Sequence, residues 1–347
     1  MNEILTPILA RLTRGNELSS DEIDAAADEI FEGRVSEVQA AGFIVALRTK
    51  GETAEELAAL VRAMHRFSTP VTVADGAIDT CGTGGDRSGT VNVSTMAALI
   101  AAGAGARVVK HGNRAASSQS GSADVFEELG VALDLGPAGV ERCVEEAGVG
   151  FCFAPRYHPA MRFLGPARKE LGVPTTFNFL GPLANPARVR RQAVGVSDPT
   201  MAATMLGALR VLGTERAIVF SGDDGLDELT TTTTSTVHEL IDGNLHEFKI
   251  DPLDVGIARS DAAHLCGGDA ATNAGVLRKV LAGEPGPCRD IAVLNAAAAL
   301  MVAGLAGDLG AGVEMAIASV DGGAAGRALE SLVRVSQAER VAEQERA

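Results

Sequence analysis

The chain has 347 residues, enough for about two domains, and 46% of them are hydrophobic while 22% are charged. These fractions are typical of a soluble globular protein and exclude a disordered or a fibrous chain. A net charge of −15 and an aromatic content of 3% argue against an extended nucleic-acid-binding surface, which requires basic and stacking side chains. An anionic ligand must therefore be bound by a local cluster of donors.

The cysteines and the apolar segments place further bounds on the protein. Its five cysteines are widely spaced and include no CxxC pair, so neither a zinc site nor a disulfide framework is indicated. The start, MNEILTPILARLTRG, lacks the continuous apolar core of a signal peptide and is typical of an amphipathic helix. The longest apolar run begins at Ile291, is interrupted by Asn295, and is short for a membrane span of about 20 residues. We therefore expect reduced thiols, a cytoplasmic location and no membrane segment.

Residues up to about 67 are predicted to be helical. Three capping boxes, at Ser19, Ser36 and Thr53, mark helix starts, because in each a hydroxyl and a side chain three residues later can satisfy unpaired amides. Apolar residues at helical spacing follow, as in AEELAALVRAMHRF.

Beyond about residue 70, short β-rich runs alternate with helical stretches, which is typical of βαβ units and a largely parallel sheet. The predicted strands are residues 107–110, 131–135, 149–154, 191–196 and 217–221. Residues 235–251 predict two further strands around an Asp-Gly-Asn turn, so the sheet is expected to be mixed. The threonine-rich residues 230–236 suit a strand or a loop. Residues 162–190 contain four prolines and predict a helix followed by an extended crossover.

A glycine-rich turn is the first candidate for chemistry. The three glycines in DTCGTGGD, residues 79–86, let the backbone turn and approach a ligand closely. The chain then passes through Asn92, Ser94 and Thr95 into an apolar helix, whose first amides and dipole favour an anion. The pattern matches neither the Walker loop nor the dinucleotide fingerprint, so on its own it is equally compatible with an ordinary turn.

A donor-rich strand end strengthens that interpretation. The stretch RVVKHGNR predicts a strand that brings Lys110, His111, Asn113 and Arg114 to the edge where open α/β sheets bind ligands. Asp124 and Glu127 mark the next helix start, which follows four serines: Ser117, Ser118, Ser120 and Ser122. Each donor alone is more typical of a structural or surface residue, but together they favour a site for a polyanion.

An acidic turn follows the predicted strand at 217–221. It places four carboxylates within six positions: Asp223, Asp224, Asp227 and Glu228. Their mutual repulsion must be offset by solvent or by cations, so an exposed turn and a Mg²⁺ site both remain open. With no Ser-His-Asp order and no nucleophile elbow, we assign no catalytic residue. The pattern favours an enzyme for a phosphorylated, metal-chelated substrate and leaves open phosphoryl transfer or pyrophosphate displacement.

Five motifs in order, GTGGD, NVST, KHGNRA, SGSAD and DELT, resemble the anthranilate phosphoribosyltransferase family, and the resemblance extends over essentially the whole chain. It implies an α/β fold with a small mainly helical domain, residues 1–68 with a crossover contribution from about 164–186. It also implies a large α/β domain, residues 69–347, that binds phosphoribosyl pyrophosphate on a central mixed, largely parallel sheet flanked by helices. The family's enzymes, usually homodimers, convert anthranilate to N-(5-phosphoribosyl)anthranilate and pyrophosphate in tryptophan biosynthesis.

The resemblance also implies the site residues. Phosphoribosyl pyrophosphate would be bound by Gly82, Thr83, Gly84, Gly85, Asp86, Thr90, Asn92, Ser94, Thr95, Lys110 and Ser122. Anthranilate would be bound by Gly82, His111, Asn113, His158 and Arg168, with Arg168 facing the carboxylate. Mg²⁺ would be held by Ser94, Asp227 and Glu228. The sequence departs from the family pattern at Arg87, at Gln119 and at the threonines after Leu229. These departures bear on the affinity for the substrates.

Two rival functions follow from related folds. A pyrimidine-nucleoside phosphorylase would use free phosphate, whereas KHGNRA and the acidic pair suit a metal-bound pyrophosphate better. A nucleic-acid-binding relative would need a basic stripe, for which a net charge of −15 leaves little room. The expected partners are therefore small molecules and a second copy of the chain, not nucleic acid or a membrane.

Overall fold

The computed structural model describes residues 2–115 and 119–346, so Ser117 and Ser118 lie outside the described residues. The N-terminal part consists of α1 (Leu5–Leu12), α2 (Ser20–Phe31), α3 (Glu37–Lys50) and α4 (Ala54–Arg66). All three predicted capping boxes are present, with Ser19, Ser36 and Thr53 each accepting from the amide three residues later. The prediction of a helical beginning is confirmed.

A seven-stranded mixed sheet forms the larger part, in the order β3-β2-β1-β4-β5-β6-β7. Its strands are β1 (Ile78–Gly82), β2 (Val108–Gly112), β3 (Val149–Phe153), β4 (Arg191–Gly195), β5 (Arg216–Gly222), β6 (Ser235–Ile241) and β7 (Asn244–Ile250). The first five pair in parallel and the last two antiparallel, which confirms the largely parallel, mixed sheet.

The strand order reverses direction between β1 and β4. From β1 the chain winds outward through β2 and β3, then returns to the other side of β1 with β4 and β5. At such a switch point the loops after neighbouring parallel strands diverge and leave a crevice at the strands' carboxyl ends. The glycine-rich turn follows β1 directly, and Gly82 lies opposite Gly195 of β4.

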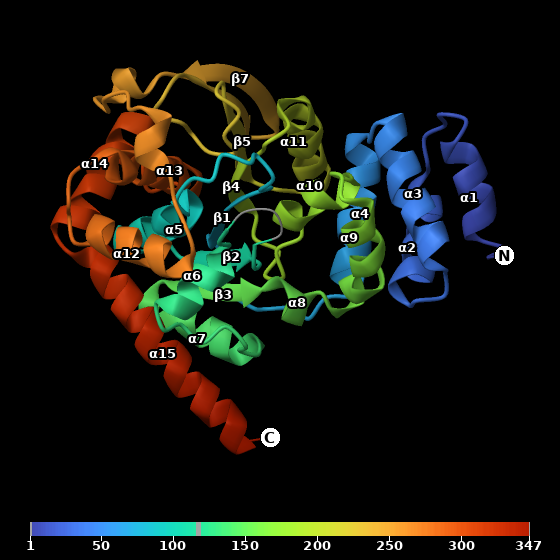
Figure 1. The fold of residues 1–347 in the computed structure, drawn as a ribbon, viewed down its shortest axis with the longest axis horizontal. Coiled ribbons are helices and arrows are strands. Elements are labelled where there is room, and N and C mark those ends of the chain that lie inside the picture. Colours follow the sequence, from blue (N-terminus) through green and yellow to red (C-terminus); the bar gives the residue numbers. More distant parts are fainter. Residues whose placement is uncertain (1, 116–118, 347) are drawn as a thin grey trace.

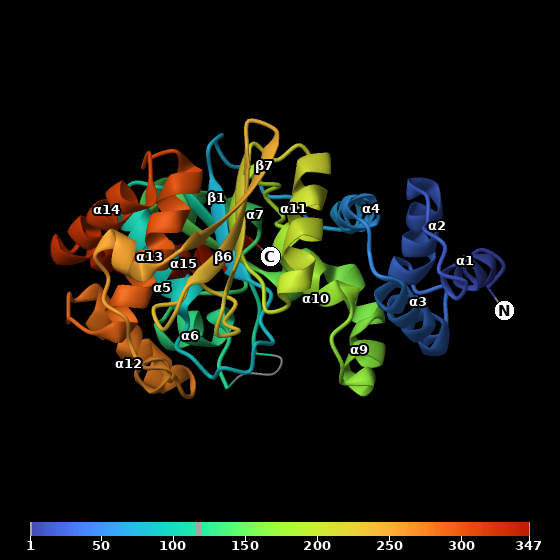
Figure 2. The same ribbon diagram turned by 90° about the horizontal axis from the view of Figure 1, so that it is seen from above.

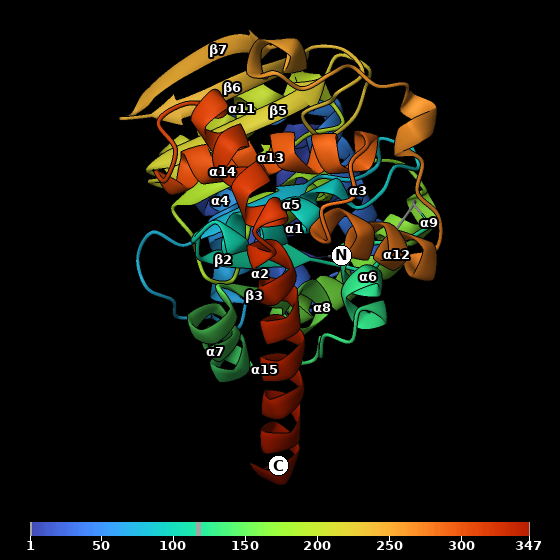
Figure 3. The same cartoon turned by 90° about the vertical axis from the view of Figure 1, so that its left-hand side faces the viewer.

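Helices cover both faces of the sheet (Figure 1). One face packs on α5 (Val93–Gly103) and α13 (Pro287–Ala303), outside which lie α14 (Leu309–Asp321) and α15 (Ala324–Arg346). The other face packs on α11 (Ala202–Val211). In Figure 3, α15 runs past the sheet and carries the C-terminus away from it. The run beginning at Ile291 is thus the buried helix that was predicted, and no described helix is long and apolar enough to cross a membrane.

The remaining helices lie in the connections between strands or, after β7, in the segment that leads to α13. They are α6 (Ser122–Glu128), α7 (Pro137–Ala147), α8 (Ala154–Tyr157), η1 (Pro159–Phe163), α9 (Gly165–Leu171), α10 (Thr176–Leu183), η2 (Pro199–Met201), η3 (Pro252–Val255), η4 (Ala262–Leu265) and α12 (Ala270–Leu281).

The N-terminal helices share a core with one face of the sheet. Phe43 and Leu57 belong to the same buried cluster as Val194 of β4 and Val219 of β5. Figure 2 shows why: α10 and α11 lie between the sheet and the block formed by α1–α4 and α9. The helical part is therefore fixed against the sheet through apolar contacts, close to the switch point.

Three local predictions were wrong or incomplete. Residues 131–135, buried except for Asp134, form no strand, because their backbone is satisfied elsewhere. The Ala132 amide donates to Ser336 Oγ of α15 (3.1 Å), and Tyr157 Oη donates to the Leu135 carbonyl (2.9 Å). The central strand β1 was not among the predicted strands. In the proline-rich crossover the predicted helix is present as α9, but the stretch expected to be extended forms a second helix, α10, with Pro182 in its last turn.

The hairpin prediction is confirmed. β6 and β7 flank Asp242 and Gly243, both with positive φ (51° and 77°), as a tight hairpin turn requires. The threonine-rich stretch enters the start of β6 from an irregular loop.

Gly195 allows the acidic turn to approach β4, because a Cβ there would overlap the Asp227 carbonyl. We expect Gly195→Ala to destabilise the protein by about 1–3 kcal/mol, as overpacking does. Gly181→Ala is the matched control, because a Cβ at Gly181 meets nothing within 4 Å. Thermal unfolding of both variants checks this; equal melting temperatures would contradict the close approach.

Candidate functional site

The glycine-rich turn after β1 folds back onto the acidic turn after β5. Gly84 and Gly85 have φ of +65° and +84°, a conformation that glycine adopts without strain. The Gly84 amide donates to Asp227 Oδ2 (2.6 Å), and Gly82 lies so close that a Cβ there would meet the same oxygen. Two turns about 140 residues apart in sequence therefore form one wall of the site.

Ser197, after β4, fixes the other side of this turn. Its amide donates to Thr83 Oγ1 (3.0 Å) and its hydroxyl donates to the Gly84 carbonyl (2.8 Å). The Thr83 amide donates to the Gly195 carbonyl (3.0 Å). Thr83 is thereby engaged by the switch-point loops, while Gly84 and Gly85 remain exposed to solvent.

Lys110 lies at the centre of the site. Although it is a lysine, it is 1% exposed on β2, and its Nζ donates to the Thr80 carbonyl (2.6 Å) and to Ser94 Oγ (3.2 Å). The Ser94 amide, in the first turn of α5, donates to Glu228 Oε1 (3.1 Å). The strand end, the helix start and the acidic turn predicted from sequence therefore converge.

Asp227 and Glu228 are adjacent carboxylates that are both buried. Burial and the nearby charge of Asp86 raise the pKa of Asp227, and burial and the charge of Asp227 raise the pKa of Glu228 well above its usual range. The Lys110 cation lowers the pKa of Glu228 but does not remove the shift. The ionised form of the pair is therefore unfavourable in the protein alone, and a bound cation would stabilise it.

The oxygens that remain suit magnesium. Asp227 Oδ2 and Glu228 Oε1 accept from backbone amides, which leaves one oxygen of each side chain for a cation. Within the described ranges, no group of three or more His, Cys, Asp or Glu side chains is arranged to hold a metal. That is compatible with Mg²⁺, which is commonly held by one or two carboxylates together with substrate phosphates.

The other two carboxylates of the acidic turn have structural partners. Asp223 forms an ion pair with Lys249 (2.6 Å) and accepts from two threonine hydroxyls. Asp224 accepts from Thr230 (2.7 Å) and Thr232 (2.5 Å). The threonine-rich stretch therefore closes the exposed half of the turn, and only the buried half faces the site.

The start of α5 presents further predicted residues. Asn92 makes no cap to the helix; its Nδ2 donates to the Ser120 carbonyl (3.1 Å) and its Oδ1 accepts from Asn273 (2.8 Å). Thr95 is fully buried, and its Oγ1 has no hydrogen-bond partner among the residues described. Thr95 is thus enclosed in the site wall, whereas Asn92 is only half-buried and is held by its two hydrogen bonds.

The loop from Asp86 to Thr90 crosses the front of the site. Asp86 accepts from the Ser88 amide and hydroxyl (3.2 and 2.7 Å), and Thr90 pairs with Cys266 in an isolated bridge. Arg87 is exposed and, unlike most non-glycine residues, has a positive φ of 58°.

The second donor turn follows β2. Asn113 is exposed, and the Ser122 hydroxyl donates to its carbonyl (3.4 Å). Gln119 is exposed on the same turn. Arg114, grouped by sequence with the ligand donors, instead forms ion pairs with Asp124 (2.9 Å) and Glu127 (2.7 Å). Its charge therefore closes the turn onto α6 and is not available to a polyanion.

Two buried histidines lie side by side behind this turn. The ring centroids of His111 and His158 are 5.0 Å apart, and the Nε2 atom of each has no partner in the part of the chain that the structure describes. His111 Nδ1 lies 3.1 Å from the Gly181 carbonyl. Burial lowers the pKa of His111 to about 3 and of His158 to about 4, so both rings are neutral at pH 7.

Arg168 lies on α9 in the block of N-terminal helices. Its side chain has no hydrogen bond or ion pair with any described residue, and burial lowers the pKa of its guanidinium. None of the contacts given above joins Arg168 to the two histidines.

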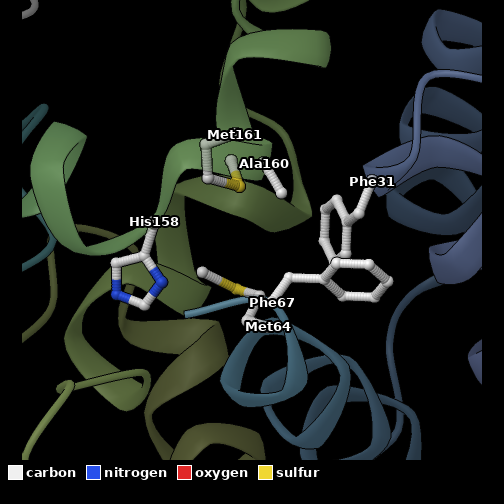
Figure 4. A pocket seen from close by; sticks show the side chains of 6 residues that line it. All are labelled: Phe31, Met64, Phe67, His158, Ala160 and Met161. Carbon is white, nitrogen blue, oxygen red and sulfur yellow. The ribbon is translucent and has the colours of Figure 1, made fainter. Parts of the chain in front are cut away.

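His158 also borders a small cavity between the helical block and η1. Figure 4 shows its ring opposite Phe31 and Phe67, with Met64 and Met161 between them. The cavity volume is only ≈ 10 Å³, about one water molecule. It is too small for an aromatic ligand in this arrangement of the chain.

Sequence reasoning missed a buried pair that supports the site. Asp79 is fully buried in β1, accepts from Asn185 Nδ2 (2.8 Å) and accepts from the His111 amide (3.2 Å). Burial raises the pKa of Asp79 to about 6. A charged residue at the start of an otherwise apolar strand was the signal that could have identified it.

The depressed histidine pKa values predict acid sensitivity. Because folded His158 titrates near pH 4 and an unfolded histidine near 6.5, protons bind the unfolded chain preferentially between these values. Stability should therefore fall as pH falls from 6.5 towards 4, with His158 accounting for about 2 kcal/mol between pH 7 and pH 5. Urea unfolding at pH 7 and at pH 5 gives the loss of unfolding free energy between the two values. That loss should be smaller in His158→Gln than in wild type. His246→Gln changes an exposed histidine and should show the same loss as wild type. Identical slopes in all three proteins would contradict the burial of His158.

Comparison with known proteins places this geometry in a family. The helical bundle domain of a glycosyl transferase family matches residues 6–68, and the a/b domain of the same family matches residues 74–326. Anthranilate phosphoribosyltransferase from Nocardioides sp. is 55% identical, covering 94% of this chain and 97% of the relative. The Rhodococcus jostii anthranilate phosphoribosyltransferase is 53% identical, covering 92% and 89%.

Solved structures agree. The crystal structure of anthranilate phosphoribosyltransferase from Thermus thermophilus superposes with a TM-score of 0.90 at 41% identity, covering 95% of this chain and 99% of that one. The Saccharomyces cerevisiae enzyme in complex with PRPP and Mg superposes with a TM-score of 0.87 at 26% identity, covering 97% and 100%. The chain therefore belongs to the anthranilate phosphoribosyltransferase family, within the glycosyl transferases that combine a helical bundle with an a/b domain.

Proposed function

We propose that this chain transfers the phosphoribosyl group of phosphoribosyl pyrophosphate to the amino group of anthranilate, releasing pyrophosphate. The observation that carries the proposal is the convergence of the glycine-rich turn, Lys110 and the buried Asp227–Glu228 pair at the switch point of the sheet. The family's activity and its place in tryptophan biosynthesis agree with this site. A Mg²⁺-dependent loss of anthranilate fluorescence on addition of phosphoribosyl pyrophosphate tests it, and no turnover by folded protein would reject it.

The diphosphate would be bound by backbone and side-chain donors from three segments. The exposed Gly84 and Gly85 offer a close approach, the first turn of α5 offers amides, and Lys110 offers a buried cation. The predicted roles of Asp86, Thr90 and Ser122 fit their places on the rim of the same site. Asn92 and Thr95 would also bind the diphosphate: Asn92 is half-buried at the start of α5, and the Thr95 hydroxyl has no partner among the described residues.

Mg²⁺ bound by Asp227, Glu228 and the Ser94 region would neutralise the charge of the pyrophosphate as it leaves. The yeast structure with PRPP and Mg supports this assignment for the family. Lys110 would stabilise the same leaving anion, because its Nζ is within hydrogen-bond distance of Ser94 at the start of α5. Burial strengthens both interactions by excluding water from the developing charges.

No general base is needed for the incoming amine. An aromatic amine is neutral at pH 7, so the protein's task is to position its nitrogen against the sugar carbon. The neutral rings of His111 and His158 provide an uncharged wall for an aromatic ring, and Arg168 provides an unpaired cation for a carboxylate. Asn113, exposed at the end of β2, would contact the same substrate.

A homodimer is a second part of the proposal. The N-terminal helices expose large apolar side chains: Ile4 is 44% exposed, Val38 81% and Val45 37%. Apolar side chains gathered on neighbouring helices favour a contact with another copy.

A nucleoside phosphorylase remains the weaker alternative, because nothing in its reaction explains a carboxylate pair in need of a divalent cation.

The first prediction concerns the buried carboxylates. Asp227→Asn with Glu228→Gln preserves the shapes and the amide contacts but removes the charge, so we expect kcat/KM to fall about 100-fold or more. Because burial raises the pKa values of both carboxyls, the melting temperature should not fall. Asp223→Asn, in the exposed half of the same turn, is the control. Full activity of the double variant would contradict the metal role.

The second prediction concerns Arg168. Arg168→Ala should raise the KM for anthranilate about tenfold or more, because a charged hydrogen bond to the carboxylate is lost, and should leave the KM for phosphoribosyl pyrophosphate nearly unchanged. Arg162→Ala is the control, since Arg162 stacks on Phe163 at an exposed position. Steady-state kinetics with each substrate varied separately measures both constants. An unchanged anthranilate KM would remove Arg168 from the binding site.

A further inference from the structure

A larger cavity lies between α4, α11 and the segment that leads into β4, away from the glycine-rich and acidic turns of the candidate site. Its volume is ≈ 240 Å³. Gln192, near the amino end of β4, borders this cavity. The glycine-rich turn instead follows Gly82, which lies opposite Gly195 at the other end of β4. Three residues of strand span about 10 Å, so the cavity lies apart from the glycine-rich turn. Its His65 is nevertheless close enough to His158 and His111 to interact electrostatically with both rings.

Two unpaired arginines border this cavity. Arg62, on α4, donates only to Ser20 Oγ (3.4 Å), and Arg188 donates to the His65 carbonyl (3.4 Å). Neither has a carboxylate partner among residues 2–115 and 119–346. The arginines that follow, Arg190 and Arg191, both pair with Glu215. In a chain with a net charge of −15, two unneutralised guanidinium groups beside one cavity favour an anionic ligand.

His65 adds an acceptor to the same cavity. His65 lines the cavity, and its Nε2 is buried and has no hydrogen-bond partner in the described ranges. The ring also forms hydrogen bonds with the backbone of Ala184 and Asn185. Burial and the charge of Arg188 lower the pKa of His65 to about 4, so the ring is neutral at pH 7. A neutral ring that donates through one nitrogen offers the other as an acceptor.

The remaining walls are largely aliphatic. Leu183, Leu209 and Leu212 line the cavity, and the first two are buried. An apolar cavity of about 150 Å³ is enough for benzene, so ≈ 240 Å³ accommodates an aromatic ring and a short polar arm. A site between the helical block and the sheet is also where small ligands commonly bind.

We propose that this cavity is a second ligand site, which binds a small carboxylate with an aryl or branched-alkyl body. The carboxylate lies between Arg62 and Arg188, and the body packs on the leucines. The two arginines come from different elements, α4 and the segment before β4, so an anion that contacts both would join the helical block to the sheet.

The test uses the full chain and a matched pair of probes, phenylacetate and its neutral isostere phenylacetamide. Titration calorimetry or ligand-observed NMR should detect saturable binding of phenylacetate, with phenylacetamide binding about tenfold more weakly or worse. Arg62→Gln with Arg188→Gln should weaken phenylacetate binding by a similar factor. Arg188→Glu alone, at an exposed position where folding is least at risk, should weaken it as well.

Two control variants locate the binding. Arg190→Ala removes a neighbouring arginine that is paired with Glu215, and Arg168→Ala removes the cation proposed for the active site. Both should leave the phenylacetate Kd unchanged within about twofold. Absence of saturable binding, equal affinity for the two probes, or equal affinity of the Arg62/Arg188 variants would overturn the proposal. Loss of binding in Arg168→Ala would place the probe in the active site and overturn it too.

Discussion

The rest of the site depends on two adjacent carboxylates, Asp227 and Glu228, that are held out of water. Their burial is costly, and the protein limits the cost with two backbone amides and the nearby cation of Lys110. Each of these contacts comes from a different segment of the sheet's carboxyl edge. These hydrogen bonds tie the glycine-rich turn, the start of α5 and the acidic turn after β5 together. In the function proposed above, a divalent cation held with substrate phosphates would balance the charge of the two carboxylates.

The fold supplies this arrangement through the reversal of strand order between β1 and β4. Gly82 and Gly195 permit the acidic turn to lie against both strands. Ser197 holds the glycine-rich turn in place through a hydrogen bond to Thr83. The N-terminal helices share their core with one face of the sheet, through residues of β4 and β5. In the proposed function, one substrate would bind at the carboxyl edge of the sheet and the other near the neutral histidines and Arg168.

Local rules predicted much of this from sequence and failed where tertiary contacts decide. Capping boxes and the Asp-Gly turn were predictable because a few neighbouring residues determine them. Residues 131–135 were mistaken for a strand because only contact with α15 and Tyr157 shows where their backbone hydrogen bonds go. Arg114 was grouped with ligand donors because its partners lie on the next helix. The Asp79–Asn185 pair could not be foreseen, since the two residues lie 106 positions apart.

A crystal structure with phosphoribosyl pyrophosphate and Mg²⁺ is the most direct measurement of the central claim. The account predicts the diphosphate between the turn at Gly84–Gly85 and Lys110, with Mg²⁺ bound by the free oxygens of Asp227 and Glu228. A diphosphate bound elsewhere, or a metal ion that contacts neither carboxylate, would contradict it.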